Sequence, residues 1–134
     1  MVLVDTNVLI DVLEDDPQWA EWSVTRLRQL SAAHELAINP VVYAELSLAF
    51  EQVEELETVV SDLQLRFMEI PRAALFLAGK AFMRYRRKGG MKHNVLPDFF
   101  IGAHAAVAEL PLLTRDTRRY RTYFPTVHVI SPDA

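Results

Sequence analysis

Residues 2–10 read Val2-Leu3-Val4-Asp5-Thr6-Asn7-Val8-Leu9-Ile10. The three apolar residues that begin this stretch are typical of a short buried strand. An acid, a threonine and an asparagine before a second apolar run are typical of a helix N-terminus, where side-chain oxygens accept hydrogen bonds from free backbone N–H groups. The stretch therefore predicts a strand whose carboxyl end leads directly into a helix, with Asp5 at the junction.

The same alternation continues along the chain, where five short apolar runs are separated by helical patterns. The predicted strands cover residues 2–4, 36–38, 67–70, 112–114 and 127–130. Prolines, which are tolerated at the first helical position, mark helix starts at Asp16-Pro17, Asn39-Pro40 and Ile70-Pro71, and Gly89-Gly90 is predicted to end the last of these helices. The pattern indicates βαβ units and a parallel sheet, an α/β fold. With 134 residues, the chain fits one domain over residues 1–134.

Three acids lie where a strand ends or a helix begins. Asp5 and Asp116 follow the first and fourth predicted strands, and Asp98 follows Pro97 at the start of a helix that is apolar almost all round. Each acid has an ordinary explanation, because acids cap helices and complement the positive end of the helix dipole. Taken one at a time, these positions do not establish a functional site.

Glu45 is harder to explain by fold chemistry alone. It is the only charged residue between Glu35 and Glu51, and it shares a predicted helical face with Val41 and Leu48. A buried carboxylate without a partner costs several kcal/mol, which favours chemistry or a bound cation as the reason for its presence. The alternative is a glutamate that reaches solvent past small neighbours, since glutamate is rarely fully buried.

All four acids are expected at the carboxyl edge of the sheet, where open α/β sheets bind ligands. In the common strand order 3-2-1-4-5, the first and fourth strands are neighbours. Two carboxylates about 4 Å apart repel by about 4 kcal/mol at an effective dielectric of about 20, so a cation or shared protons must stabilise the cluster. Carboxylates without thiolates or paired histidines favour Mg²⁺ or Mn²⁺, which activate water and neutralise phosphoryl groups. Asn7 and Thr114 are placed to orient the acids, although ordinary turn chemistry explains them equally well.

Four ordered motifs resemble the PIN-domain ribonucleases, and more narrowly the VapC-type toxins of bacterial toxin–antitoxin pairs. They are residues 2–10, Glu45, Pro97-Asp98-Phe99-Phe100-Ile101-Gly102-Ala103-His104-Ala105, and Leu112-Leu113-Thr114-Arg115-Asp116. The resemblance spans essentially the whole chain, but residues 50–95 carry no motif of that family. It implies a three-layer α/β/α sandwich around a mainly parallel five-stranded sheet.

The resemblance also implies an activity, namely Mg²⁺- or Mn²⁺-dependent cleavage of RNA. Asp5 and Asp98 would be the main metal ligands, Glu45 and Asp116 would complete the acidic pocket, and Thr114 would support it. The implied partners are an RNA substrate, a second copy of the chain in a homodimer, and a cognate antitoxin whose tail blocks the pocket.

Charge is divided unevenly along a chain whose net charge is −4. Residues 1–65 hold thirteen acids and two bases, whereas residues 66–134 hold five acids and twelve bases. The basic residues predicted to contact an RNA backbone are Arg84, Arg87, Lys88, Arg115, Arg118 and Arg119. The competing explanation is that basic residues near a helix C-terminus favour the dipole and solubility. Tyr120 could stack on an unpaired base, yet it is more readily read as core, as is His104.

Composition excludes several classes of protein. The absence of cysteine rules out disulfides and thiolate metal sites and fits a reducing cytoplasm. No apolar stretch approaches the roughly 18 residues of a membrane span, so a cytoplasmic protein is expected. A receiver domain or an aspartate-nucleophile phosphatase fits poorly, because Asp5 has neither an adjacent acid nor one two residues later. A non-toxin RNA-processing nuclease and a non-catalytic binding module remain the alternatives.

Overall fold

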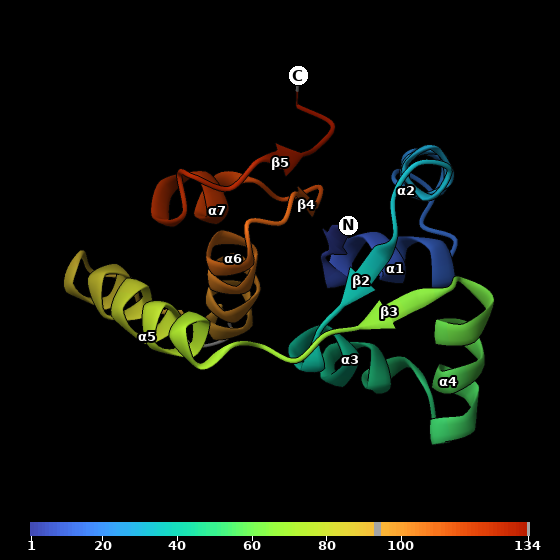
Figure 1. Ribbon diagram of the computed structural model, residues 1–134, viewed down its shortest axis with the longest axis horizontal. Helices are drawn as coiled ribbons and strands as arrows, with labels where there is room; N and C mark the ends of the chain where they lie inside the picture. The colour runs from blue at the N-terminus through green and yellow to red at the C-terminus, as the bar shows by residue number, and fades with distance from the viewer. Residues whose placement is uncertain (93–94, 134) are drawn as a thin grey trace.

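The structure is a computed structural model that describes residues 1–92 and 95–133 (Figure 1). Its strands are β1 (Val2–Val4), β2 (Leu36–Ile38), β3 (Leu65–Phe67), β4 (Leu112–Leu113) and β5 (Val129–Ile130). Its helices are α1 (Thr6–Leu13), α2 (Ala20–Ser31), α3 (Pro40–Leu46), α4 (Val53–Asp62), α5 (Arg72–Arg87), α6 (Leu96–Ala108) and α7 (Arg118–Tyr123), with a 3₁₀ turn η1 (Ser47–Ala49) after α3. Strands and helices alternate as the sequence predicts.

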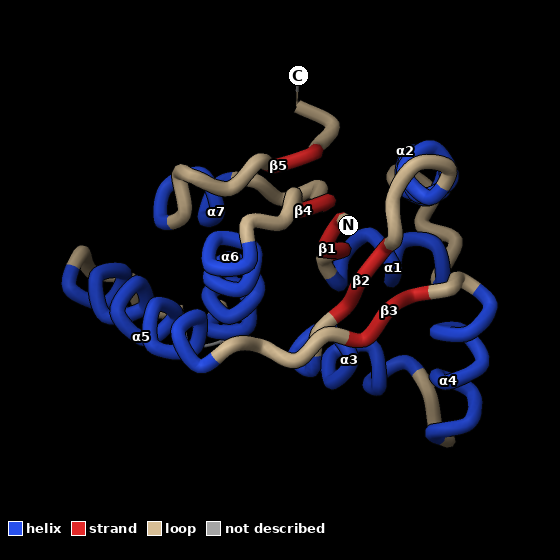
Figure 2. The backbone as a smooth tube through the Cα atoms, viewed as in Figure 1, coloured by secondary structure: helices blue, strands red, loops and turns tan. Residues whose placement is uncertain are grey.

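All five strands are parallel and lie in the order β3-β2-β1-β4-β5. Central β1 pairs Leu3 with Ala37 of β2 on one side and with Leu112 of β4 on the other. Crossovers between parallel strands are right-handed, so the change of direction after β3 sends α1–α4 to one face of the sheet and α5–α7 to the other. Figures 1 and 2 show these two helical layers with the strands between them. The predicted α/β/α sandwich and strand order are confirmed.

The bounds of three strands differ from the prediction. β3 begins and ends earlier than residues 67–70, because its pairing with β2 joins Leu65 to Leu36 and Phe67 to Ile38. β4 and β5 are each shorter than predicted: β4 ends at Leu113 and β5 begins at Val129, where the pairing between them ends and begins. Strand length is thus set by the neighbouring strand rather than by the length of the apolar run.

Two of the three proline-marked helix starts also differ. Pro40 opens α3 as predicted, with Asn39 as its N-cap, but Pro71 is itself the N-cap of α5. The helix predicted after Asp16-Pro17 begins only at Ala20, because the Asp16 carboxylate accepts hydrogen bonds from the next backbone N–H groups and holds a turn there. No helix among the described residues is both long and apolar enough to cross a membrane.

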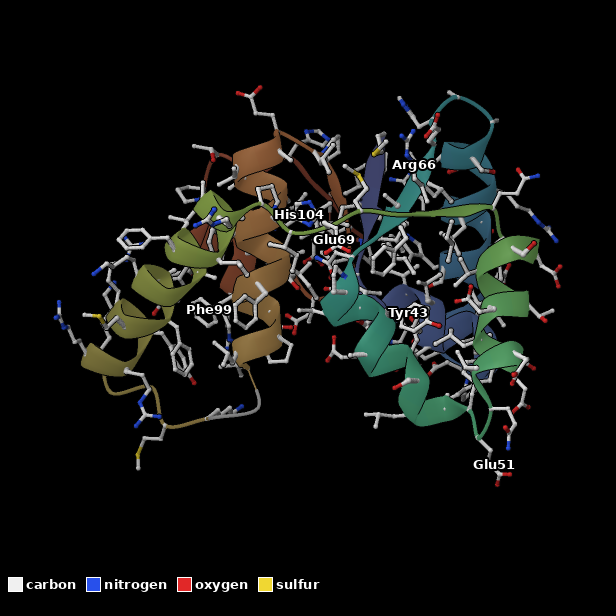
Figure 3. All side chains as sticks on the ribbon, turned by 60° about the horizontal axis from the view of Figure 1, so that its bottom comes forward. Tyr43, Glu51, Arg66, Glu69, Phe99 and His104 are labelled. Atoms are coloured by element: carbon white, nitrogen blue, oxygen red, sulfur yellow. The ribbon has the colours of Figure 1, made fainter. Side chains whose placement is uncertain are left out.

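Helix α6 forms the centre of the layer that contains α5 and α7. Its side chains are buried on several faces, as its nearly continuous apolar sequence predicts. Figure 3 shows Phe99 directed from α6 toward α5. On the side facing α7, a Cβ atom at Gly102 would overlap the ring of Phe124 and lie 3.0 Å from Tyr120. The glycine therefore lets α7 approach α6 closely, at the edge of the sheet where the acids lie.

Candidate active site

Two neighbouring strands bring polar residues to the same edge of the sheet. Asp5 follows β1 and Thr114 follows β4, and both are buried, with Asp5 only 4% exposed. Oδ1 of Asp5 accepts a hydrogen bond from the Thr6 N–H at 2.8 Å, which caps α1. Asp5 is therefore a helix cap, as one explanation predicts, but the cap occupies only Oδ1 and leaves Oδ2 for other partners.

The second oxygen of Asp5 accepts three hydrogen bonds. Its donors are the Tyr120 hydroxyl at 2.8 Å, Thr114 Oγ1 at 2.9 Å and Asn7 Nδ2 at 3.3 Å. Burial raises the pKa of Asp5 to about 7, with a further contribution from the charge on Asp98, while the bonds from Tyr120, Thr114 and the Thr6 amide act in the opposite direction. Burial and the charge on Asp5 raise the pKa of Tyr120 well above its ordinary value, so its phenol remains a donor.

Asp98 lies in the first turn of α6 and forms a salt bridge with α7. Its Oδ2 is 2.6 Å from Nη1 of Arg119, and 29% of its side chain is exposed. Burial raises the pKa of Asp98 to about 6; Arg119 lowers it, and the charges of Glu45 and Asp116 raise it. The ionised carboxylate is thus disfavoured even with a guanidinium beside it.

Glu45 and Asp116 complete the acidic region. Glu45 is half-buried and accepts a hydrogen bond from Thr6 Oγ1 at 2.7 Å. The prediction that it shares a buried face with Leu48 is wrong, because α3 ends at Leu46 and Leu48 is 88% exposed. Asp116 is exposed, and its backbone N–H donates to Thr114 Oγ1 at 3.1 Å. The structure therefore brings together all the predicted acids and their two predicted supporting residues: Asp5, Glu45, Asp98, Asp116, Asn7 and Thr114.

The donor chemistry of this region fits a hard divalent cation. Its acids offer carboxylate oxygens, and they lie close enough to act on one another: the charge on Asp98 raises the pKa of Asp5, and the charges on Glu45 and Asp116 raise that of Asp98. A bound cation would reduce the repulsion between these carboxylates and lower their raised pKa values. The described residues contain no group of three acidic or histidine side chains already spaced as a ligand shell, and one oxygen of Asp98 is bonded to Arg119. A metal ion held directly by three of these side chains would therefore require the carboxylates to move closer together.

A second buried acid, not singled out in the sequence, fixes the loop after β4. Asp11 is 1% exposed and forms two hydrogen bonds with Arg115, from Nε at 2.8 Å and from Nη2 at 3.1 Å. Asp11 also accepts from the Ser23 hydroxyl at 3.1 Å, and the Arg115 guanidinium lies 5.6 Å from the Trp19 ring centroid. This network ties the loop that carries Asp116 to α1 and α2, which gives Arg115 a structural role besides the predicted contact with RNA.

The other predicted RNA contacts lie on two neighbouring elements. Arg84, Arg87 and Lys88 are exposed near the C-terminal end of α5, and Arg118 is exposed at the start of α7. Lys88 Nζ lies 5.8 Å from the Tyr123 ring centroid, so it faces α7. Exposed bases therefore lie on α5 and α7, and Arg119 of α7 pairs with Asp98.

Sequence reasoning missed Tyr120 and Thr6 as direct partners of the acids, and the Arg119–Asp98 pair. Tyr120 was read as core, and it is 2% exposed, but its hydroxyl reaches Asp5. A buried tyrosine hydroxyl needs a partner, but nothing in the sequence identifies Asp5 as that partner. The Arg119 pair had no such signal, since its neighbours in sequence carry the same charge.

The geometry has counterparts among known proteins. The PIN domain family matches the chain over residues 2–125. The chain belongs to this family. The PIN domain also resembles solved structures along its whole length. VapBC2 from Rickettsia felis, bound to a DNA fragment from its promoter, gives a TM-score of 0.75 at 19% identity and covers 99% of this chain and 100% of that one.

Two further solved structures are similar to this PIN domain. A toxin–antitoxin complex from Klebsiella pneumoniae gives a TM-score of 0.67 at 24% identity, with 98% of each chain covered. VapBC-1 from nontypeable Haemophilus influenzae gives 0.73 at 16% identity, again with 98% of each chain covered. At these identities the likeness shows the fold. No curated protein matches the sequence.

Proposed function

We propose that this PIN domain is a metal-dependent endoribonuclease, the toxin of a type II toxin–antitoxin pair. The observation that carries the proposal is a pair of acids at the edge of the sheet, the buried Asp5 and the partly buried Asp98, whose pKa values are raised to about 7 and about 6. Acids that the fold holds at such a cost are typical of functional sites. Glu45 and Asp116 add negative charge to the same place.

Each residue has a proposed part in the reaction. Asp5 and Asp98 would hold Mg²⁺ or Mn²⁺, with Glu45 and Asp116 completing the pocket. When bound, the metal supplies an activated water and neutralises charge on the phosphoryl group. Tyr120 and Thr114 donate to Asp5 and so keep its carboxylate oriented and more readily ionised. Asn7 links Asp5 to Thr114, since its Nδ2 lies 3.3 Å from one and 3.1 Å from the other.

The proposed partners follow from charge and from the similar structures. RNA is the proposed substrate, because Arg119 of α7 pairs with Asp98 and further bases, such as Arg84 of α5 and Arg118 of α7, are exposed on the same two helices. A cognate antitoxin is supported by the fold, which is that of chains in toxin–antitoxin structures. The Arg119–Asp98 pair supports the idea that a basic side chain of such a partner can bind the acids. A homodimer is proposed on the resemblance to VapC-type toxins alone.

The enzymatic proposal is tested by cleavage of a broad panel of RNAs with Mg²⁺ or Mn²⁺ present. Wild type is expected to cut at least one RNA, and EDTA should stop it. Asp98→Asn should lower the rate by more than about 100-fold, since loss of a residue that merely orients a metal ligand costs about 10–100-fold. Asp62→Asn, an exposed acid at the end of α4, is the matched control and should cut at the wild-type rate.

Indistinguishable RNA patterns from wild type and Asp98→Asn would refute the nuclease and favour a binding module. The toxin role is tested separately by expression in bacteria. Wild type is expected to stop growth, Asp98→Asn is not, and the product of a short upstream reading frame should restore growth. RNA cleavage without an effect on growth would instead indicate an RNA-processing nuclease.

A further inference from the structure

A small hollow lies between the C-terminal end of α5 and helix α7, which are near each other in Figure 1. Its volume is about 340 Å³, at the small end of the range for ligand pockets. The residues that line it are Tyr85, Lys92, Arg118, Arg119, Thr122 and Tyr123. Three of these six are basic and none is acidic, so the hollow has the chemistry of an anion site.

Arg119 connects this hollow to the acids. Its Nη1 contacts Asp98 at 2.6 Å, and its guanidinium carbon lies 6.0 Å from the ring centroid of Tyr85 on the hollow's wall. The hollow therefore begins where the acidic region ends.

The wall formed by Tyr85 is fixed by its neighbours. The Tyr85 ring lies 5.5 Å from Phe99 and 6.2 Å from Tyr123, centroid to centroid, and its hydroxyl accepts from the Lys92 N–H at 3.3 Å. The backbone at Gly90 lies directly against the same ring, where a Cβ atom would come within 2.5 Å. These contacts hold the segment that carries Lys92 at the rim, so the hollow is formed before a ligand arrives.

The other two bases, Lys92 and Arg118, differ from Arg119 in their pairing with acids. Lys92 and Arg118 are exposed, and within residues 1–92 and 95–133 neither side chain forms an ion pair. By contrast, Arg115 and Arg119 are both paired with acids. Two uncompensated bases at the rim of one hollow make a site for a phosphate group, which accepts several charge-assisted hydrogen bonds.

We propose that this hollow binds a backbone phosphate of the RNA strand, next to the phosphodiester held at the acids, through Lys92 and Arg118. The inference rests on the proposed function, and it identifies where the substrate strand leaves the cleavage site. Phosphate contacts carry no sequence information, so the hollow fixes the position of the strand rather than choosing its bases.

The test compares two double variants of equal charge. Lys92→Ala/Arg118→Ala removes the two bases at the hollow, and Lys80→Ala/Arg121→Ala removes two bases elsewhere on α5 and α7. Lys80 lies over the ring of Phe76, and Arg121 reaches toward Ser131, so neither lines the hollow. Both doubles are made with Asp98→Asn, which prevents cleavage while binding is measured, and a thermal unfolding scan checks that each folds.

Binding of single-stranded RNA oligonucleotides is measured at several salt concentrations. The hollow double is expected to weaken binding about tenfold for every RNA sequence and to reduce the salt slope by about 0.7, the contribution of the one single-strand phosphate that the two bases share. The control double should change the affinity less than about twofold and leave the slope unchanged. Equal effects of the two doubles, an unchanged affinity in the hollow double, or no RNA binding at all would overturn the proposal.

Two other probes separate the source of the anion. Inorganic phosphate is expected to bind far more weakly than RNA, and equal affinity would overturn the assignment to an RNA strand. A polyglutamate peptide that binds as tightly as RNA, and only when Lys92 and Arg118 are present, would assign the hollow to an acidic protein segment instead. The nuclease proposal is tested separately, by cleavage of RNA by the wild type. If the wild type does not cleave RNA but its RNA binding still depends on Lys92 and Arg118, the nuclease proposal fails and the phosphate site stands.

Discussion

Asp98 illustrates how a single carboxylate can be bonded well and still destabilise the fold. It has a guanidinium at 2.6 Å, yet burial and two neighbouring acids raise its pKa from an ordinary 3.8 to about 6. The folded protein therefore keeps a proton that the unfolded chain releases between about pH 4 and pH 6. By proton linkage, the contribution of Asp98 to stability falls as the pH rises through that window, and the loss is complete above it.

Asp98→Asn is accordingly expected to unfold at an equal or higher temperature than wild type, in EDTA near pH 7.5. A shift of about two pKa units corresponds to about 3 kcal/mol, but partial exposure and the weaker bond from Arg119 to an amide reduce the net gain to about 0–2 kcal/mol. Thermal unfolding measures it, with Asp62→Asn as the exposed control, for which no change is expected. A clear loss of stability would show that Asp98 serves chiefly as a structural residue of α6.

The sequence predicts those site residues whose place follows from the end of a strand or the start of a helix. Asp5 and Asp116 stand at strand ends and Asp98 at a helix start, and the structure brings all three together. The contact of Tyr120 with Asp5 joins residues 115 positions apart and depends on how α7 packs, so neither spacing nor composition contains it. The Asp11–Arg115 pair is hidden for the same reason.

Packing between α6 and α7 determines whether two adjacent residues of α7 reach the acids. Arg119 bonds to Asp98 and Tyr120 bonds to Asp5, and both depend on the close approach that Gly102 permits. The ring that a Cβ atom at Gly102 would overlap belongs to Phe124, which is 3% exposed and has little room to move. The glycine is therefore a requirement of the candidate site as well as of the core.

Gly102→Ala is expected to push α7 outward and lower the free energy of unfolding by about 1–3 kcal/mol, the usual cost of overpacking a core. Gly79→Ala is the matched control, because Gly79 is an exposed helical glycine of α5 with no atom within 4 Å of the added Cβ. That change should stabilise the protein by about 0.5–1 kcal/mol, as alanine does in helices. Chemical denaturation measures both, and equal effects of the two substitutions would contradict the packing explanation.

Elements differ in how far the sequence defines them. Helix α6 is predicted well because it is apolar on nearly every face, a pattern that only a buried helix satisfies. Strands of two or three residues are located correctly, but their ends depend on pairing with a neighbour, as in β3, which begins at Leu65 to match Leu36. The start of α2 is missed because the Asp16 side chain stabilises a turn in place of the first helical residues.

Across the whole molecule, the uneven charge of the sequence becomes an arrangement in space. The acidic half contributes Asp5, which follows β1, and Glu45 of α3, and the basic half contributes Arg119 of α7, which pairs with Asp98. Because the two halves meet at one edge of the sheet, acids that repel one another lie next to bases that can attract a phosphate backbone. Net charge alone conceals this division.

Stability as a function of pH reports on the acids as a group. Without metal, Asp5 and Asp98 hold protons in the folded state up to about pH 7 and about pH 6, so the contribution of these two acids to stability falls as the pH rises from about 4 to 7. Mg²⁺ binds the deprotonated carboxylates and competes with these protons, so its stabilising effect should grow over the same range. Burial lowers the pKa of His104, so this residue costs stability only as the pH falls below about 6.5. It does not affect the comparison of metal and EDTA above that pH.

Unfolding temperatures with saturating Mg²⁺ and with EDTA are therefore expected to be nearly equal near pH 5.5 and to separate by several degrees near pH 8, at about 2–5 °C for each kcal/mol of binding energy. Asp98→Asn should reduce the separation at every pH, whereas Asp62→Asn should leave it as in wild type. A shift that is the same at both pH values, or the same in Asp98→Asn, would place the bound metal away from these acids. The raised pKa values would then reflect burial alone, and the carboxylates at the sheet edge would have no part in holding a cation.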